Sequence, residues 1–238
     1  EVIEKQAIVL GSEFIRFDKD FEIEEKNQKW IFKNKKGVFE FDKSQYLNQQ
    51  HQLENLSSVL AFILKQNKFS FDFENVNEGI VNAKWPARLE KIENGNLYNR
   101  VVDIIGDTQF ELIVDGGHNS EAGDAVNSFL NSKSDKFKII IFSMVEDKDY
   151  KEYLSKIAGE IDLLIACDIE NSVNNRSTDE ICDFAKEIKL PCIKSSLIEK
   201  AIDEAVCFTK SNQMIKDCVI LVAGSLYLAG NFIEKNQL

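Results

Sequence analysis

The stretch Leu112–Asn119 (LIVDGGHN) is an apolar run that ends at a carboxylate, two glycines, an imidazole and an amide. A β-branched apolar run that stops at small residues and is followed by a helical pattern is typical of a buried strand delivering polar groups to the C-terminal edge of an α/β sheet. Glycines let backbone N–H groups approach a ligand, and the helix expected from Asn119 points its positive end at the same place. The stretch therefore predicts a ligand site. It also suits an ordinary turn in which Asp115 and Asn119 only cap a helix.

Apolar runs and helical patterns alternate through the second part of the chain. Expected strands at 89–92 and 98–105, joined by a turn at 94–96, precede the strand that ends at Asp115. The pattern then predicts helix 122–130, strand 137–142, helix 150–157, strand 163–167, helix 178–188, a short strand near Cys192, helix 197–208, strand 218–222 and helix 226–233. This alternation predicts an α/β fold with a doubly wound, mostly parallel sheet and right-handed crossovers.

The first part of the chain has a different pattern. It predicts a helix at 2–10 that ends at Gly11, short strands at 14–17, 29–32 and 38–41 with a hairpin between Trp30 and Phe41, and helices at 53–64 and 76–81. Pro86 disfavours helical backbone at Trp85, and we place a domain boundary there. The sequence thus predicts two domains, 1–84 and 85–238.

Composition restricts the partners and the compartment. The net charge of −11, with acidic and basic residues mixed along the chain, excludes an extended surface for nucleic acid or an anionic membrane. No apolar run approaches the roughly 18–20 residues of a membrane span. Five cysteines at wide spacings, odd in number and without a CxxC pair, predict reduced thiols in a cytoplasmic protein.

Three strand ends carry groups suited to anions. Ser225 follows strand 218–222 at the start of a helix, Lys148 lies where strand 137–142 leads into a helix, and His118 follows the strand that ends at Asp115. Parallel strands would bring these groups to one edge, which predicts a shared cleft. Near the domain boundary, the guanidinium of Arg88 suits a phosphate. For Lys148 and Arg88 the competing interpretations are a solvated charge cluster and a surface ion pair.

Several common site patterns are absent. The chain has no G-x-x-x-x-G-K-[ST] loop, so it does not by itself cradle a triphosphate in that manner. It also has no His, Cys or carboxylate group at metal-ligand spacing, no Gly-x-Ser-x-Gly elbow and no Ser-His-Asp set. We therefore expect no metal site within this chain.

Five motifs occur together in one order: HQLEN at 51–55, WPARLE at 85–90, DGGHN at 115–119, DKD at 147–149 and GSLY at 224–227. In order and spacing they resemble the C-terminal portion of folylpolyglutamate synthase/dihydrofolate synthase, a member of the Mur ligase superfamily. The resemblance covers essentially the whole chain. It implies that 85–238 form a Mur ligase C-terminal (glutamate ligase) domain and that 1–84 form the C-terminal part of the central ATPase domain.

The resemblance implies an activity as well. Enzymes of this family use ATP and Mg²⁺ to phosphorylate a pterin-linked carboxylate of folate or dihydropteroate, and the amine of L-glutamate then attacks the acyl phosphate. The cleft lies between the two domains and closes over the substrates. A cytoplasmic monomer is implied. The phosphate loop and the magnesium ligands belong to an N-terminal part that this chain lacks, so we expect a partial enzyme that is inactive alone.

Each family role carries over onto a matching residue of this sequence. Asn55 resembles the asparagine on the adenine side, Arg88 the arginine that reaches the nucleotide, and Asp115 the aspartate that holds the ribose. His118 resembles a histidine facing the phosphates or the incoming amino acid. We assign it to nucleotide binding and, with Lys148, to catalysis. Ser225 resembles a residue on the side that receives glutamate.

Some positions depart from the family pattern. The family has Gly where this chain has Ala87, and Ala and Pro where it has Gly117 and Ser120. Two alternatives to a ligase remain. One is a non-catalytic α/β binding module derived from such a ligase. The other is a phosphatase-like enzyme with Asp115 as nucleophile. Such sites have a second acidic residue two positions later, where this chain has Gly117.

Overall fold

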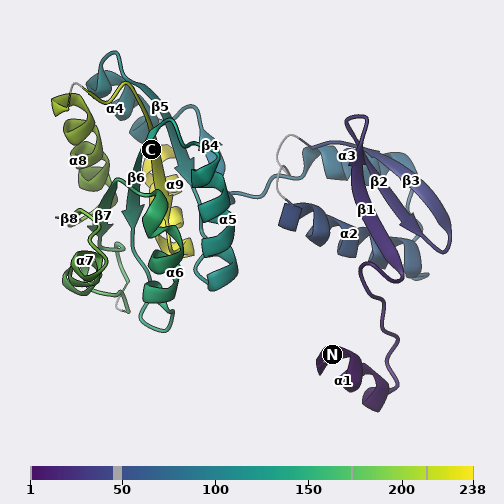
Figure 1. Cartoon of the computed structure of the whole chain (residues 1–238). Coiled ribbons are helices and arrows are strands. Elements are labelled where there is room, and N and C mark those ends of the chain that lie inside the picture. The colour runs from purple at the N-terminus through teal and green to yellow at the C-terminus, as the bar shows by residue number, and fades with distance from the viewer. Residues whose placement is uncertain (1, 45–49, 173, 213, 238) are drawn as a thin grey trace. The chain divides into compact units, whose positions relative to one another are not determined.

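The computed structural model describes residues 2–44, 50–172, 174–212 and 214–237, with only the backbone described at Gln50 and His51 (Figure 1). The side chain of His51, in the first of the five motifs, lies outside this description. The chain divides into two compact units, Glu1–Trp85 and Pro86–Leu238, called here the N-terminal and the C-terminal unit.

The N-terminal unit is a small antiparallel sheet covered by helices. Its elements are α1 (Val2–Leu10), β1 (Phe21–Lys26), β2 (Lys29–Asn34), β3 (Gly37–Asp42), α2 (Gln50–Lys65) and α3 (Phe73–Asn82), with strand order β1-β2-β3. Alternate strand residues, among them Trp30, Phe32 and Phe41, pack with Leu60 of α2 and Ile80 of α3 in one buried cluster. The predicted hairpin is confirmed, because Trp30 pairs with Phe41.

Two details of this unit differ from the prediction. Residues 14–17 do not form a strand, and only an isolated bridge joins Phe17 to Phe21. Strand β1 was not predicted, because four of its six residues (FEIEEK) are charged. Its apolar residues Phe21 and Ile23 nonetheless face the core, and the charged residues alternate with them on the open face, where Lys33 pairs with Glu22 and Glu24.

The C-terminal unit contains a six-stranded sheet in the order β4-β5-β9-β6-β7-β8. Its strands are β4 (Glu90–Ile92), β5 (Gln109–Val114), β6 (Phe137–Phe142), β7 (Leu163–Cys167), β8 (Cys192–Ser195) and β9 (Asp217–Ala223). Its helices are α4 (Asn96–Ile105), α5 (Ser120–Asn131), α6 (Tyr150–Ile157), α7 (Thr178–Glu187), α8 (Ile198–Ser211) and α9 (Leu226–Gln237), with a short 3₁₀ turn at Ala158–Glu160. Only β4 is antiparallel to its neighbour, so the predicted α/β fold with a mostly parallel sheet is confirmed.

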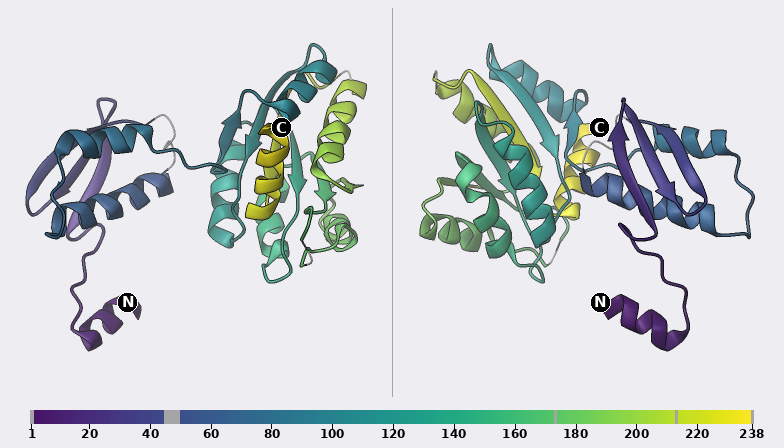
Figure 2. Two further views of the ribbon diagram at one scale, coloured as in Figure 1. Left: turned by 180° about the vertical axis from the view of Figure 1, so that it is seen from behind. Right: turned by 45° about the vertical axis from the view of Figure 1, so that its right-hand side comes forward.

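Helices cover both faces of this sheet (Figure 2). The buried residues of α4, α8 and α9 form one core with Leu112 and Val114 of β5. Those of α5, α6 and α7 form the other core with Ile113, which points to the opposite face. Alternate strand residues are thus buried on opposite sides, which is why the strands are near-continuous apolar runs in the sequence.

The prediction of a strand at 98–105 is wrong, because these residues belong to helix α4. Its β-branched residues suggested a strand, but the buried positions are Leu97, Val101 and Ile105, each four residues after the last. That spacing places them on one face of a helix. Gly95, with a φ of 107°, therefore precedes a helix and is not the centre of a hairpin turn.

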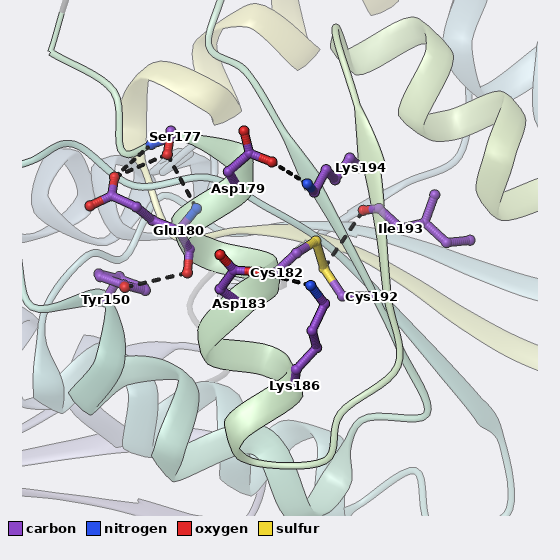
Figure 3. The surroundings of a disulfide bond; sticks show 10 residues. All are labelled: Tyr150, Ser177, Asp179, Glu180, Cys182, Asp183, Lys186, Cys192, Ile193 and Lys194. Atoms are coloured by element: carbon purple, nitrogen blue, oxygen red, sulfur yellow. Dashed lines mark hydrogen bonds and ion pairs between the residues drawn. A yellow bond between two sulfur atoms is a disulfide. The ribbon is translucent and has the colours of Figure 1, made fainter.

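The prediction that all five cysteines are reduced is wrong for two of them. Cys182 of α7 and Cys192 of β8 form a disulfide, with their Cα atoms 5.5 Å apart (Figure 3). They are ten positions apart in the sequence, and the packing of α7 on β8 brings them together, which no cysteine spacing in the sequence shows. The other three, Cys167, Cys207 and Cys218, are free. Burial raises the pKa of the Cys167 thiol to about 12, so it stays protonated at neutral pH.

We expect the disulfide to stabilise the C-terminal unit measurably. Cys192→Ser should lower its free energy of unfolding by about 2–3 kcal/mol, because a cross-link over a loop of this length restricts the unfolded chain. Urea unfolding in a non-reducing buffer measures the change, and Cys207→Ser, which alters an exposed free cysteine, is the control. Alkylation of the unfolded, unreduced chain should label the three free thiols only. Labelling of all five would show that the bond does not form.

Candidate functional site

The C-terminal ends of the parallel strands meet at one edge of the sheet, beside a cavity of about 970 Å³. Segments that follow four different strands line it, and the segment after β9 includes residues of α9. The lining residues are His118 after β5; Val145, Glu146, Asp147 and Lys148 after β6; Glu170, Asn171, Ser172 and Asn174 after β7; and Ser225, Leu226, Tyr227 and Asn231 after β9. This arrangement is the one expected of a ligand site in a doubly wound sheet.

Three of the six residues singled out in the sequence lie together here: His118, Lys148 and Ser225. His118 is half-buried, and its Nδ1 lies 3.4 Å from the carbonyl oxygen of Gly116. Lys148 keeps about a third of its side chain exposed and lies 3.2 Å from Asp147. The predicted shared cleft therefore contains an imidazole, an ammonium group and a hydroxyl.

Ser225 sits at the start of α9, and only 2% of its surface is exposed. Its Oγ accepts a hydrogen bond from the backbone N–H of Tyr227 at 3.1 Å, and its carbonyl oxygen accepts one from Ala229 at 3.0 Å. The serine thus caps the helix, and the N-terminal turn of α9 borders the cavity. Unsatisfied N–H groups and the helix dipole at such a place favour an anion such as a carboxylate.

Acidic side chains line the same cavity. Glu146 and Asp147 are exposed, and Glu170 is half-buried and paired with Lys235 at 3.0 Å. Carboxylates there suit a positively charged ammonium group, whereas Lys148 and the start of α9 suit negative groups. The cavity therefore offers partners for both charges of an amino acid.

Asp115 does not line this cavity. Only 6% of the residue is exposed, and both carboxylate oxygens accept backbone hydrogen bonds: Oδ1 from Gly117 N at 2.8 Å and Oδ2 from Leu89 N at 2.9 Å. The carboxylate thus joins the turn after β5 to the segment before β4. A buried carboxylate engaged in this way is a poor nucleophile, so the geometry disfavours the phosphatase-like alternative.

Arg88 is half-buried and lies between two residues with left-handed backbone, Ala87 at φ 55° and Leu89 at φ 46°. Non-glycine residues rarely adopt this conformation, and such strain persists only where the surroundings hold it. Here Ala87 N donates to Glu90 Oε2 at 2.9 Å, and Gly116 N donates to the carbonyl oxygen of Ala87 at 2.8 Å. The backbone around Arg88 is therefore fixed by its neighbours.

Asn55 lies exposed on α2, in the N-terminal unit. The six predicted residues thus fall into three groups: His118, Lys148 and Ser225 at the cavity; Arg88 and Asp115 in the backbone junction beside β4 and β5; and Asn55 in the other unit.

The segment after β7 also lines the site, although it was not predicted to do so. Glu170, Asn171 and Asn174 line the cavity, as does Asn231 of α9, whose Oδ1 accepts a hydrogen bond from Glu170 N at 2.8 Å. A signal was present, because strand 163–167 was predicted and its C-terminal end had to reach the same edge. Asn231 gave no signal, since it lies inside a helix.

Within the described parts of the chain, no three His, Cys, Asp or Glu side chains are grouped so as to hold a metal ion. None of the helices in those parts is both long enough and apolar enough to cross a membrane.

Sequence comparison shows which known proteins this chain resembles. The profile of the family described as dihydrofolate synthetase, C-terminal domain, matches residues 100–235, more than half of the chain. Folylpolyglutamate synthase of Lacticaseibacillus casei is 21% identical over 96% of this chain and 49% of its own length. The probable dihydrofolate synthetase of Schizosaccharomyces pombe is 28% identical over 78% of this chain and 42% of its own length. The chain thus spans about half the length of these relatives.

Solved structures share the fold. Folylpolyglutamate synthase of Mycobacterium tuberculosis, complexed with ADP and AMPPCP, aligns with a TM-score of 0.75 at 20% identity, over 98% of this chain and 51% of that one. A bifunctional folylpolyglutamate synthase/dihydrofolate synthase with Mn, AMPPNP and L-glutamate bound aligns with a TM-score of 0.72 at 18% identity, over 97% and 49%. The chain belongs to the folylpolyglutamate synthase/dihydrofolate synthase family.

Proposed function

We propose that this chain is the glutamate-receiving part of an enzyme that ligates L-glutamate to folate, or to dihydropteroate, at the expense of ATP. In this proposal the C-terminal unit is the glutamate ligase domain and the N-terminal unit is the C-terminal part of the central ATPase domain. Family membership supports the reaction class. The observation that carries the assignment of glutamate to this chain is the cavity at the sheet edge, with groups of both charges around it.

The cavity residues can hold an amino acid in a defined direction. The start of α9 with Ser225, together with Lys148, would hold carboxylates of L-glutamate. Glu146 or Asp147 would hold its ammonium group until it loses a proton. His118, on the β5 side of the cavity, would face the reacting carbonyl or the phosphate that leaves it.

ATP supplies the activation, because it converts the folate carboxylate to an acyl phosphate. The nitrogen lone pair of glutamate then attacks the carbonyl carbon. A C–N bond forms, the tetrahedral intermediate collapses, phosphate leaves and the nitrogen loses a proton. This chain would contribute by placing the amine and by stabilising the developing negative charge with Lys148 and His118.

The contacts with ATP that we propose for this chain come from the family resemblance. Arg88 and Asn55 remain our proposals for contacts with ATP, and Asp115 for the ribose, although its oxygens are engaged by the backbone. We assign no magnesium ligand to this chain, because the family resemblance places those ligands in the N-terminal part of the enzyme. Activity would then need the part of the ligase fold that carries the phosphate loop. The cytoplasmic location and the monomeric state stay predictions.

Binding of L-glutamate tests the proposal most simply. Isothermal titration of the chain should show saturable binding of L-glutamate and much weaker binding of L-lysine, which lacks the second carboxylate. Lys148→Met should weaken L-glutamate binding at least tenfold, because it removes a cation from the cavity without shortening the side chain.

Lys210→Met is the matched control, since it removes an exposed lysine near the end of α8, outside the cavity. Equal losses in the two variants would point to a general effect of charge. Absence of saturable binding to the folded chain would count against the cavity as the glutamate site. The non-catalytic binding module would then take precedence if the cavity proved to select another ligand.

A further inference from the structure

Two loops line the cavity and are called here its wall loops. The first wall loop, residues 143–149, joins β6 to α6 and contributes Glu146, Asp147 and Lys148. The second wall loop, residues 168–177 with Val173 outside the described part, joins β7 to α7 and contributes Glu170, Asn171, Ser172 and Asn174. Because each wall comes from a different strand, the shape of the cavity depends on what holds the two loops together.

The backbones of the two loops touch over a short stretch. Glu146 N donates to the carbonyl oxygen of Asn174 at 2.9 Å, and Val145 and Asn175 form an isolated antiparallel bridge. The side chain of Asn175 holds its own loop in shape, donating through Nδ2 to the carbonyl oxygen of Ile169 at 2.9 Å. The backbone contacts between the two loops thus extend over a few residues.

Arg176 adds further bonds between the two loops. Its backbone N donates to the carbonyl oxygen of Met144 at 2.8 Å, and its Nη2 donates to that of Glu146 at 2.6 Å. Its guanidinium carbon lies 5.1 Å from the centre of the Tyr150 ring, and Nη1 lies 3.4 Å from Glu180 Oε1. One side chain therefore contacts the first wall loop, the start of α6 and the start of α7.

The two side chains that Arg176 contacts, Tyr150 and Glu180, are themselves held in place by other contacts. Glu180 forms a capping box with Ser177 at the start of α7, and Tyr150 Oη donates to the carbonyl oxygen of Glu180 at 3.5 Å (Figure 3). Tyr150 is 7% exposed, and its ring meets Phe184 of α7 edge to face. The arginine side chain is only 22% exposed, so its bonds are largely shielded from water.

We propose that Arg176 is a positioning residue that sets the distance between the two wall loops and thereby places Lys148 in the cavity. Lys148 N donates to the carbonyl oxygen of Val145 at 3.2 Å, so the turn carrying Lys148 is built on the segment that Arg176 holds. Where the inference names L-glutamate as the ligand, it rests on the proposed function. The fixed planar fork of the arginine explains why a lysine would not replace it fully.

Hydrogen exchange on the chain itself tests the positioning role without any ligand. In Arg176→Met, the amides of Glu146 and Lys148 should exchange at least tenfold faster, with little change at buried amides of β5 and β9. Arg176→Lys should lie between the variant and the native chain. Arg100→Met, which removes an exposed arginine paired with Asp203 on α8, should leave both amides unchanged.

L-glutamate titration provides the second readout. Arg176→Met should weaken binding about tenfold or more, and Arg176→Lys should recover part of the loss. Unchanged exchange at Glu146 and Lys148 would overturn the proposal. Equal acceleration throughout the C-terminal unit would also overturn it, because Arg176 would then only stabilise the fold. If exchange rises as expected but the native chain does not bind L-glutamate, the positioning role stands and the proposed function fails.

Discussion

Gly224→Ala should lower the free energy of unfolding of the C-terminal unit by about 4 kcal/mol, from backbone strain and overpacking together. Gly224 has a φ of 102°, where L-residues are strained. A Cβ there would lie 2.4 Å from Cε2 of Phe142 and 2.6 Å from the carbonyl oxygen of Ser143. Phe142 is fully buried against Tyr153, and Ser143 begins the first wall loop, so neither can move without disturbing the core or the cavity.

Gly230→Ala is the matched control for this substitution. Gly230 lies six residues further on, inside α9, and a Cβ there would meet no atom within 4 Å. Alanine should therefore raise stability by about 0.5–1 kcal/mol, since it favours helix over the unfolded chain. A Gly224→Ala variant as stable as the native chain would show that the close approach of β9 to β6 does not exist in solution.

Urea unfolding can follow the two units separately. Both tryptophans, Trp30 and Trp85, belong to the N-terminal unit, so the fluorescence of buried Trp30 monitors the small sheet. Far-UV circular dichroism includes the larger unit. We expect Gly224→Ala to shift the dichroism transition to lower urea and to leave the fluorescence transition in place. A common shift of both signals would mean that the units unfold as one.

The sequence predicts the helices and strands of the C-terminal unit well where burial produces a recognisable pattern of apolar residues. Strands β5, β6, β7 and β9 are continuous apolar runs because helices cover both faces of the sheet. Helix α4 was not predicted because its β-branched residues, which favour strands, were given more weight than the four-residue spacing of its apolar positions. Strand β1 was not predicted because its charged face is exposed, which leaves two inward apolar residues as its signal in the sequence.

The candidate site was predictable only in part, for a different reason. Strand ends identify His118, Lys148 and Ser225, because topology brings parallel strand ends together. Pairings that depend on three-dimensional packing left no trace in the sequence. The disulfide between Cys182 and Cys192, the hydrogen bond that Glu170 N of the second wall loop donates to Asn231, and the contacts of Arg176 are all of this kind.

Asp115 is the residue for which sequence and geometry suggest different roles, and substitution can separate them. The family resemblance predicts a ribose contact, so Asp115→Asn would weaken nucleotide binding and leave stability almost unchanged. The structure shows a carboxylate that accepts hydrogen bonds from Gly117 N and Leu89 N. An amide has one acceptor oxygen, so one of these two N–H groups, which are buried or partly buried, would face the Nδ2 donor of asparagine.

We therefore expect Asp115→Asn to lower the free energy of unfolding of the C-terminal unit by about 3 kcal/mol, because hydrogen bonds to charged groups contribute roughly 1.5–3 kcal/mol each and an unpaired buried N–H adds a penalty. The melting temperature should fall by about 6–12 °C. Asp107→Asn, at an exposed carboxylate between α4 and β5, should shift the melting temperature little.

If Asp115→Asn melts like the native chain but binds ADP more weakly, the main role of the carboxylate is to bind the nucleotide. If stability and the exchange protection of Leu89 N and Gly117 N fall together, its first role is to fasten the strained segment around Arg88 to β5. Any effect on the nucleotide would then reach it through Arg88.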